Sequence, residues 1–235
     1  MKGILYLIPS TLGETSPVSN IPEHNLGIIE KLHHFVVEDL RTARRFLRKV
    51  MHGINIDAKT FQILNEHTRP EEISALLTPL MEGQDMGLLS EAGLPCVADP
   101  GALLVSHAHE NGIKVVPLSG PSSVFLALMA SGFNGQNFAF CGYLPIDKKE
   151  RISKIRELES SAYQHDQTQI FIETPYRNQQ MMEALVETCR PQTKICIAFD
   201  LTLPGETVIT YTAKQWNMNK WPDIQKKPAV FLLYR

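Results

Sequence analysis

Two loops rich in glycine, proline and small side chains constrain this 235-residue chain most, because each follows a short buried strand. The apolar runs at residues 86–89 and 113–118 are predicted to be those strands. The first run is followed by a loop at 90–101, and the second by the segment S-G-P-S-S at 119–123. In an open α/β sheet, small ligands bind beyond the carboxyl ends of the strands. The two loops are therefore the candidate ligand site.

The chemistry of these loops suits a ligand with an acidic group. Glycine lets the backbone approach a ligand closely, because it has no side chain to collide with it. The helix predicted to start at Pro121 offers free backbone N–H groups, which bind carboxylates and phosphates.

Apolar strands alternate with helical patterns along the first half of the chain. The expected strands are residues 4–8, 35–37, 59–64, 86–89 and 113–118. The expected helices include residues 23–32, 40–51 and 70–81. This β-α-β-α order predicts a mostly parallel sheet in an α/β domain.

The second half has a different pattern, with several strands close together. We expect strands at 138–144, 169–173, 194–199, 207–212 and 229–234, and helices at 148–159 and 175–189. Such spacing favours a mixed sheet. The sequence thus predicts an α/β protein with two domains, residues 1–118 and 119–235, and a cleft between them.

Composition is that of a packed globular protein, with 43% hydrophobic and 20% charged residues. The longest apolar runs, such as 124–130 and 229–234, fall far short of the roughly 20 residues that a membrane helix needs. No convincing signal peptide opens the chain. We therefore expect a cytoplasmic protein with no membrane segment.

Cysteine and histidine give no sign of a metal site. The four cysteines form no C-x-x-C pair, and no Cys/His spacing suits zinc, so we assign no metal. Cys96 lies in the first candidate loop, but no neighbouring residue would lower its pKa, which argues against a nucleophilic role.

One segment is strongly basic although the chain as a whole carries a net charge of −2. Five cations share a single predicted helix: Arg41, Arg44, Arg45, Arg48 and Lys49. A protein with a broad phosphate-binding face would usually be more basic overall. Two interpretations therefore stay open, a solvated helix face and a local surface for nucleic acid.

Four short segments carry a family resemblance. They read S-E-A-G-L-P at 90–95, D-P-G at 99–101, S-G-P-S-S at 119–123 and S-G-F at 131–133. In the same order and at the same spacing, they resemble S-D-A-G-T-P, D-P-G, P-G-P-S-A and S-G-L of the tetrapyrrole methylase superfamily of S-adenosylmethionine-dependent methyltransferases. The chain is most similar to the branch that methylates a ribose 2′-hydroxyl of a cytidine in small-subunit ribosomal RNA.

The resemblance implies a homodimer that binds S-adenosyl-L-methionine in the cleft between two α/β domains. By position in the motifs, it implies the following cofactor-binding residues: Pro9, Ser90, Glu91, Ala92, Gly93, Ser122, Ser123, Glu173, Leu201 and Pro228. The alternative for the first loop is a plain βα turn, and for Ser122 and Ser123 it is helix capping.

The segment E-D-L-R at 38–41 resembles the family's E-D-T-R at the end of a strand, which implies catalytic roles for Glu38, Asp39 and Arg41. A ribose hydroxyl is a poor nucleophile, so a carboxylate within hydrogen-bond reach would help by accepting its proton. Arg41 would bind a phosphate or orient that carboxylate. The alternative is structural, because Asp39 is well placed to cap the following helix and Glu38 to stabilise its dipole.

Glu14, Leu40, Glu91 and Leu203 depart from the pattern of the ribosomal branch. They leave three hypotheses open. The first is methyl transfer to small-subunit ribosomal RNA, the second is methyl transfer to a tetrapyrrole or another small molecule, and the third is a non-catalytic protein that binds S-adenosylmethionine.

Overall fold

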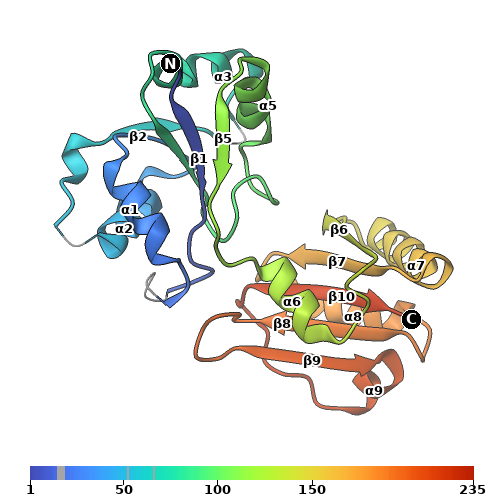
Figure 1. Ribbon diagram of the computed structural model, residues 1–235. Coiled ribbons are helices and arrows are strands. Elements are labelled where there is room, and N and C mark those ends of the chain that lie inside the picture. The colour runs from blue at the N-terminus through green and yellow to red at the C-terminus, as the bar shows by residue number, and fades with distance from the viewer. Residues whose placement is uncertain (15–18, 52, 66) are drawn as a thin grey trace. The chain divides into compact units, whose positions relative to one another are not determined.

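A computed structural model describes residues 1–14, 19–51, 53–65 and 67–235 (Figure 1). The chain divides into two compact units, Met1–Ser122 and Ser123–Arg235, called unit 1 and unit 2 below. Each has its own sheet and its own hydrophobic core.

Unit 1 is built on a five-stranded sheet in which every paired strand is parallel. The strand order β3-β2-β4-β1-β5 places β1 between β4 and β5. The strands are β1 (Ile4–Ile8), β2 (His34–Val37), β3 (Thr60–Ile63), β4 (Met86–Leu89) and β5 (Lys114–Pro117). Because the strands are parallel, the loops that follow β1, β4 and β5 leave from one end of the sheet.

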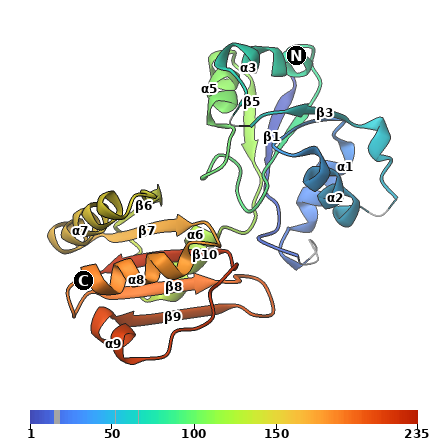
Figure 2. The ribbon, with the colours of Figure 1, turned by 180° about the vertical axis from the view of Figure 1, so that it is seen from behind.

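Helices cover both faces of this sheet, as Figure 1 and the view from behind in Figure 2 show. One face carries α1 (Glu23–Lys31) and α2 (Leu40–Val50), and the other carries α3 (Pro70–Leu76), α4 (Thr78–Met81) and α5 (Ala102–Glu110). The 3₁₀ turn η2 (Ile56–Ala58) lies beside α2. Side chains alternate along β2, so Phe35 and Val37 join the core under α1 and α2 while Val36 joins the other core.

Unit 2 contains a mixed sheet in the order β6-β7-β10-β8-β9. The strands are β6 (Phe138–Tyr143), β7 (Thr168–Glu173), β8 (Lys194–Phe199), β9 (Thr207–Thr212) and β10 (Ala229–Tyr234). Strand β6 pairs with β7 in parallel, and the other pairs are antiparallel. The helices are α6 (Ser123–Ser131), α7 (Lys148–His165), α8 (Asn178–Thr188) and α9 (Ala213–Met218), and α6 packs on β8, β9 and β10.

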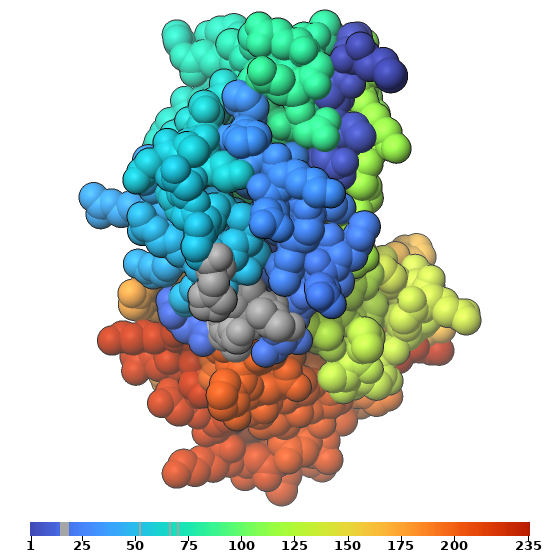
Figure 3. Space-filling model, turned by 60° about the vertical axis from the view of Figure 1, so that its left-hand side comes forward, coloured from blue at the N-terminus to red at the C-terminus, as the bar shows by residue number. Residues whose placement is uncertain are grey.

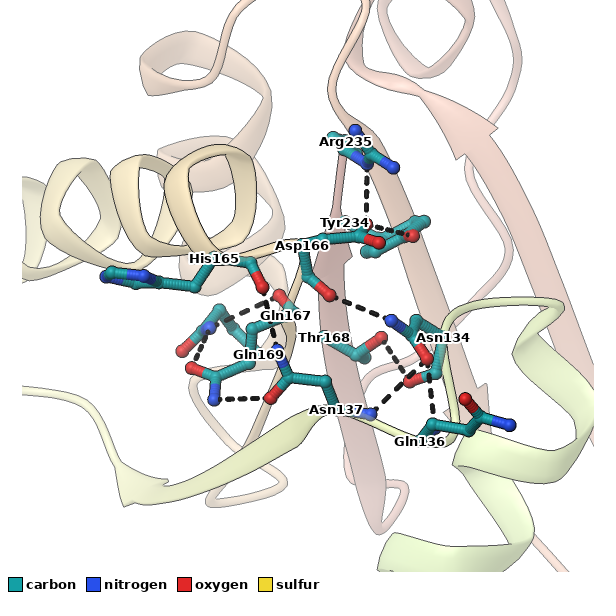
Figure 4. A network of polar contacts seen from close by, with 10 residues as sticks. All are labelled: Asn134, Gln136, Asn137, His165, Asp166, Gln167, Thr168, Gln169, Tyr234 and Arg235. Carbon is teal, nitrogen blue, oxygen red and sulfur yellow. Dashed lines mark hydrogen bonds and ion pairs between the residues drawn. The ribbon is translucent and has the colours of Figure 1, made fainter.

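A network of polar side chains holds the amino end of β7 (Figure 4). Asn134 and Asn137 donate side-chain hydrogen bonds to the backbone carbonyls of Asp166 and His165. The Asp166 carboxylate in turn accepts a hydrogen bond from the Tyr234 hydroxyl and pairs with Arg235. These bonds fix the turn between α7 and β7, the strand that ends at the predicted cofactor-binding residue Glu173.

The observed architecture confirms the predicted α/β class, with a parallel sheet first and a mixed sheet second. Two details differ. The single helix expected at 70–81 is two helices, α3 and α4, because Pro79 has no N–H for a continuous helix. The connection expected before the last strand contains α9, whose start is capped by Thr212 and Gln215.

Candidate functional site

The loops after β1 and β4 are hydrogen-bonded to each other. The backbone N–H of Ser10 donates to the Gly93 carbonyl at 2.9 Å and to the Ser90 hydroxyl oxygen at 3.2 Å. The Ser90 hydroxyl donates to the Gly93 carbonyl at 2.6 Å. Ser10, Ser90 and Gly93 are all buried. The two loops therefore form one rigid layer at the end of the sheet.

The loop after β5 packs against this layer. A Cβ atom added to Gly120 would lie 2.3 Å from Cγ of Pro9, so only glycine fits there. A Cβ on Gly93 would lie 3.4 Å from the Pro121 carbonyl oxygen. From α1, the buried Asn25 side chain donates a 2.6 Å hydrogen bond to the Ser119 carbonyl. The three loops are thus in contact, as a ligand site at the ends of neighbouring strands requires.

Six of the residues predicted to bind a cofactor lie in these three loops of unit 1: Pro9, Ser90, Glu91, Ala92, Gly93 and Ser122. Ala92 is exposed, whereas Ser90 and Ser122 are buried. Ser123 is the first residue of α6 and belongs to unit 2.

A hollow of about 200 Å³ lies beside these loops. Its walls come from residues 10–14, from residues 89–92 and from the side chains of α2, namely Thr42, Ala43, Arg45, Phe46 and Lys49. Pockets for whole small ligands measure about 300–1,000 Å³. The hollow is therefore large enough for part of a ligand.

Backbone strain gathers in the candidate loops. Outside glycine, six described residues have a positive φ, a conformation that costs non-glycine residues roughly 1–3 kcal/mol. Cys96 and Ala98 lie in the loop after β4, and Asp200, Thr202 and Lys226 lie in loops of unit 2. Strain of this kind concentrates at functional sites, where the surrounding structure maintains it.

Asp39 caps α2 in the structure. Its Oδ1 accepts hydrogen bonds from the backbone N–H groups of Arg41 and Thr42, each at 2.9 Å, and from the Thr42 hydroxyl. These bonds, first the one from the Thr42 N–H, hold the pKa of Asp39 below its ordinary value. A carboxylate with a lowered pKa is a weak proton acceptor. Asp39 therefore has the capping role that was considered as the alternative to catalysis. The Arg41 side chain is exposed.

Glu91 links the loop after β4 to the start of α2. Its Oε1 accepts a 2.7 Å hydrogen bond from the Thr42 hydroxyl and a 3.3 Å bond from the Asp39 N–H. The longer side chain at this position, compared with the Asp of the family motif, reaches the neighbouring strand's loop. Thr42 is a site residue that the sequence analysis missed, although it lies three residues after the cap, where capping partners occur.

Asp99 is the acidic side chain whose environment is most unusual. Burial raises the pKa of its carboxyl group to about 6, and the nearby charges of Glu38 and Glu91 add to the rise. The Glu91 backbone N–H donates to the Asp99 carboxylate. Asp99 does not cap the following helix, because the N-cap of α5 is Gly101. The D-P-G motif was the signal that this position belongs to the site.

Cys96 is not a nucleophile. Burial, together with the charge of Asp99, raises the pKa of its thiol to about 11, so the thiol stays protonated at neutral pH. This confirms the expectation that nothing around Cys96 activates it.

In unit 2, the buried Glu173 and the half-buried Arg177 form an ion pair. The Glu173 Oε1 accepts from the Thr174 N–H and from Nε of Arg177, which lies 2.9 Å away. Four buried side-chain atoms of this region have no hydrogen-bond partner in the described part of the chain: Oε2 of Glu173, Nη1 of Arg177, Oδ1 of Asn178 and Oγ1 of Thr202. Unpaired buried polar atoms are costly, so a polar ligand would stabilise them.

Leu201 and Pro228 lie at the same edge of the unit 2 sheet as Glu173. Residue Ala229, which follows Pro228, is paired with Glu173 on one side and with Phe199 on the other. The Pro228 carbonyl accepts a hydrogen bond from the Asp200 N–H, and Leu201 is buried. Arg177 and Asn178, which the sequence did not single out, join this group, because Arg177 pairs with Glu173 and the Asn178 side chain donates to the Lys227 carbonyl.

No helix among the described residues is both long enough and apolar enough to cross a membrane. In the same residues, no group of three or more His, Cys, Asp or Glu side chains is arranged to hold a metal ion.

The chain is similar to several curated proteins named "Ribosomal RNA small subunit methyltransferase I". It is 32% identical to the one from Vibrio cholerae serotype O1, over 92% of this chain and 74% of that protein. It is 30% identical to the one from Pasteurella multocida, over 99% of this chain and 79% of that protein. It is also 32% identical to the one from Escherichia coli O157:H7, over 88% of this chain and 68% of that protein.

Solved structures share the fold. The methyltransferase CobJ superposes with a TM-score of 0.65 at 17% identity, covering 100% of this chain and 95% of that one. The uroporphyrin-III-C-methyltransferase from Thermus thermophilus superposes with a TM-score of 0.55 at 19% identity, covering 100% of this chain and 93% of that one. The family model "Tetrapyrrole (Corrin/Porphyrin) Methylases" matches residues 23–216. The chain therefore belongs to the tetrapyrrole methylase family.

Proposed function

We propose that the protein transfers the methyl group of S-adenosylmethionine to small-subunit ribosomal RNA, and that the acceptor is a ribose 2′-hydroxyl. One observation carries the proposal: the chain is 32% identical, over 92% of its length, to an enzyme named as a small-subunit ribosomal RNA methyltransferase. The choice of the 2′-hydroxyl rests on the resemblance of the motifs at 38–41 and 90–95 to the ribosomal branch.

The residues of both units fit S-adenosylmethionine. In unit 1, Gly93 and Gly120 let the three loops pack closely, and the exposed Ala92 adds little bulk where a ligand would lie. In unit 2, the buried Nη1 atom of the half-buried Arg177 side chain is a donor without a partner among the described residues, as the carboxylate of the ligand would require. When bound, the cofactor would supply a methyl group made electrophilic by its sulfonium.

We assign the cofactor contacts in two sets. In unit 1 they are Pro9, Ser90, Glu91, Ala92, Gly93 and Ser122, and in unit 2 they are Ser123, Glu173, Leu201 and Pro228. The roles differ within each set. Pro9 and Ser90 shape the loops through their contacts with Gly120 and Ser10.

Asp99 is the better candidate for the proton acceptor. In the reaction, the 2′-oxygen forms a bond to the methyl carbon as the carbon–sulfur bond breaks, and the hydroxyl proton passes to a base. The Asp99 carboxyl group, with a pKa of about 6, is ionised at neutral pH and is more basic than the capping carboxylate of Asp39. Glu38, whose charge helps to raise that pKa, is assigned a supporting role.

The protein's setting is part of the proposal. We infer a homodimer, as the family resemblance implies, and a cytoplasmic location, where ribosomal RNA is available. The two units described above correspond to the two domains of the proposed enzyme.

Two measurements test this function. Calorimetry with S-adenosylmethionine measures cofactor binding, and Ser122→Trp should abolish it by filling the space beside the loop. Transfer of a labelled methyl group to deproteinised small-subunit ribosomal RNA measures the activity. Binding with no labelling of RNA would contradict the proposed acceptor, and unaltered affinity of Ser122→Trp would contradict the assigned loop.

A further inference from the structure

Helix α2 is amphipathic in an unusual way, because every charged residue on its polar face is a cation. Four residues face the core: Ala43, Phe46, Leu47 and Val50. Five cations line a shallow hollow of about 450 Å³ on the outer side: Arg41, Arg44, Arg45, Arg48 and Lys49. We call these five residues the basic face. Figure 3 shows the surface of unit 1 to which α2 belongs, drawn in blue and cyan.

The spacing of the basic face brings like charges close together along the helix. Arg41 and Arg45, Arg44 and Arg48, and Arg45 and Lys49 each lie four residues apart, where like charges repel. A solvated helix face usually alternates charges of opposite sign at this spacing. No acidic residue occurs between Leu40 and Val50 to relieve the repulsion. Such a surface gains most from an external polyanion.

Acidic side chains from outside the helix neutralise only part of the basic face. The Glu14 carboxylate reaches it from the loop after β1, with Oε2 2.9 Å from Nζ of Lys49 and Oε1 3.6 Å from Nη1 of Arg45. The hydrogen bond from Lys49 lowers the pKa of Glu14, so Glu14 is ionised at neutral pH. Asp57 pairs with Arg44.

The remaining two cations are available to a ligand. Arg41 and Arg48 have no ion-pair partner in residues 1–14, 19–51, 53–65 and 67–235. Both side chains are exposed.

We propose that the basic face of α2 binds the phosphodiester backbone of RNA, and that Glu14 occupies one phosphate position until RNA displaces it. A carboxylate held between two cations marks a position that a phosphate oxygen can also fill. The partner class rests on the proposed function, since RNA is the polyanion that the enzyme must hold.

Displacement of Glu14 would also act on the candidate site. Glu14, Arg45 and Lys49 line the 200 Å³ hollow together with Ser90 and Glu91 of the loop after β4. RNA phosphate that replaces the Glu14 carboxylate would therefore release the loop after β1 from α2. Binding of RNA and the shape of the hollow are coupled through this one side chain.

The direction in which a Glu14 substitution changes RNA affinity distinguishes this proposal from a merely structural role of Glu14. Fluorescence anisotropy with a 20-nucleotide single-stranded RNA, in the absence of cofactor, gives the Kd between 50 and 200 mM salt. Arg48→Gln should weaken binding and reduce the slope of log K against log salt by about 0.7, as expected for one lost phosphate contact on a single strand. Glu14→Gln should instead tighten binding, because the competing anion is gone.

Arg156→Gln, which removes an exposed cation from α7 in unit 2, is the matched control and should leave the Kd unchanged. Weaker binding by Glu14→Gln, or an unaltered slope in Arg48→Gln, would overturn the proposal. Equally tight binding of polyglutamate would overturn the assignment to RNA. Melting temperatures of all variants exclude misfolding as the cause.

The two proposals fail separately in these experiments. If the protein methylates ribosomal RNA but Arg48→Gln and Glu14→Gln bind RNA like the wild type, only the proposal about the basic face is overturned. RNA binding that depends on the basic face, without any methyl transfer, would overturn only the proposed function.

Discussion

The hydroxyl of Thr42 donates a 2.7 Å hydrogen bond to the Glu91 carboxylate and thereby joins the start of α2 to the loop after β4. The same Glu91 oxygen accepts from the Asp39 N–H. One carboxylate thus fixes the helix that carries the basic face relative to the loop that carries the candidate cofactor contacts, and both belong to unit 1.

Thr42→Val should loosen this junction, because valine has the same shape without the hydroxyl. Hydrogen bonds to charged groups contribute about 1.5–3 kcal/mol, and exposure to solvent here brings the expected loss of unfolding free energy to about 1 kcal/mol. Urea denaturation measures it, and methyl transfer should fall as well. Thr42→Ser keeps the hydroxyl and should behave like the wild type. Equal stability of Thr42→Val and wild type would show that the junction is not held by this bond.

Asp39→Ala and Asp39→Asn distinguish capping from catalysis. Loss of the cap in Asp39→Ala should cost about 0.5–2 kcal/mol, whereas asparagine caps nearly as well as aspartate. We expect Asp39→Asn to keep both the stability and most of the methyl transfer. Denaturation curves and initial rates give the answer. Near-complete loss of transfer in a stable Asp39→Asn variant would make Asp39 the proton acceptor in place of Asp99.

Asp99→Asn should change the pH dependence of stability. In the folded protein the pKa of Asp99 is about 6, raised from an ordinary 3.8, so between these values the folded state binds more protons than the unfolded state. The stability of the wild type therefore falls as the pH rises from about 4 to about 6. Asp99→Asn removes this decline, so its melting temperature should exceed that of the wild type at pH 7 and match it near pH 3. A wild-type melting curve without this relative decline would contradict the buried carboxyl group.

Asp99→Asn also tests catalysis. General-base catalysis contributes about 10²- to 10⁴-fold to a rate, so transfer should fall by that range while the affinity for S-adenosylmethionine stays the same. In the wild type, the rate should rise as the pH increases through about 6 and then level off. A rate that is unchanged in Asp99→Asn would remove the residue from the mechanism.

Gly120→Ala should disrupt the packing of the loop after β5. The new Cβ would lie 2.3 Å from the Pro9 ring, so one of the two loops must shift. We expect lower stability and weaker binding of S-adenosylmethionine, measured by denaturation and calorimetry. Gly27→Ala is the matched control, because nothing lies within 4 Å of its added Cβ and alanine stabilises a helix by about 0.5–1 kcal/mol over glycine. Normal cofactor affinity in Gly120→Ala would show that the contact is unimportant for the site.

Secondary structure was most predictable where apolar runs have clear ends. The strands Lys194–Phe199, Thr207–Thr212 and Ala229–Tyr234 have the predicted bounds, because runs of β-branched and aromatic residues stand between polar or proline-containing segments. Helix α9 was not predicted, because it has only six residues and its N-cap, Thr212, is also the last residue of strand β9.

The loops of the site could be located from sequence, but their connections could not. Strand ends and glycine positions indicated the loops after β4 and β5, since parallel strands place such loops at one edge of a sheet. The bond between Thr42 and Glu91 spans 49 residues, and the ion pair between Glu14 and Lys49 spans 35. Contacts at such separations depend on the tertiary packing. The raised pKa of Asp99 has the same origin, because it comes from burial.

The proposed function is tested most directly by nucleoside analysis of its product. Deproteinised small-subunit ribosomal RNA is incubated with the protein and S-adenosylmethionine, digested to nucleosides and examined by mass spectrometry. The account predicts one new nucleoside that carries its added methyl group on the ribose 2′-oxygen, and its yield should fall sharply in Asp99→Asn. A methyl group found only on a base, or no methylated nucleoside from a protein that binds S-adenosylmethionine, would contradict it.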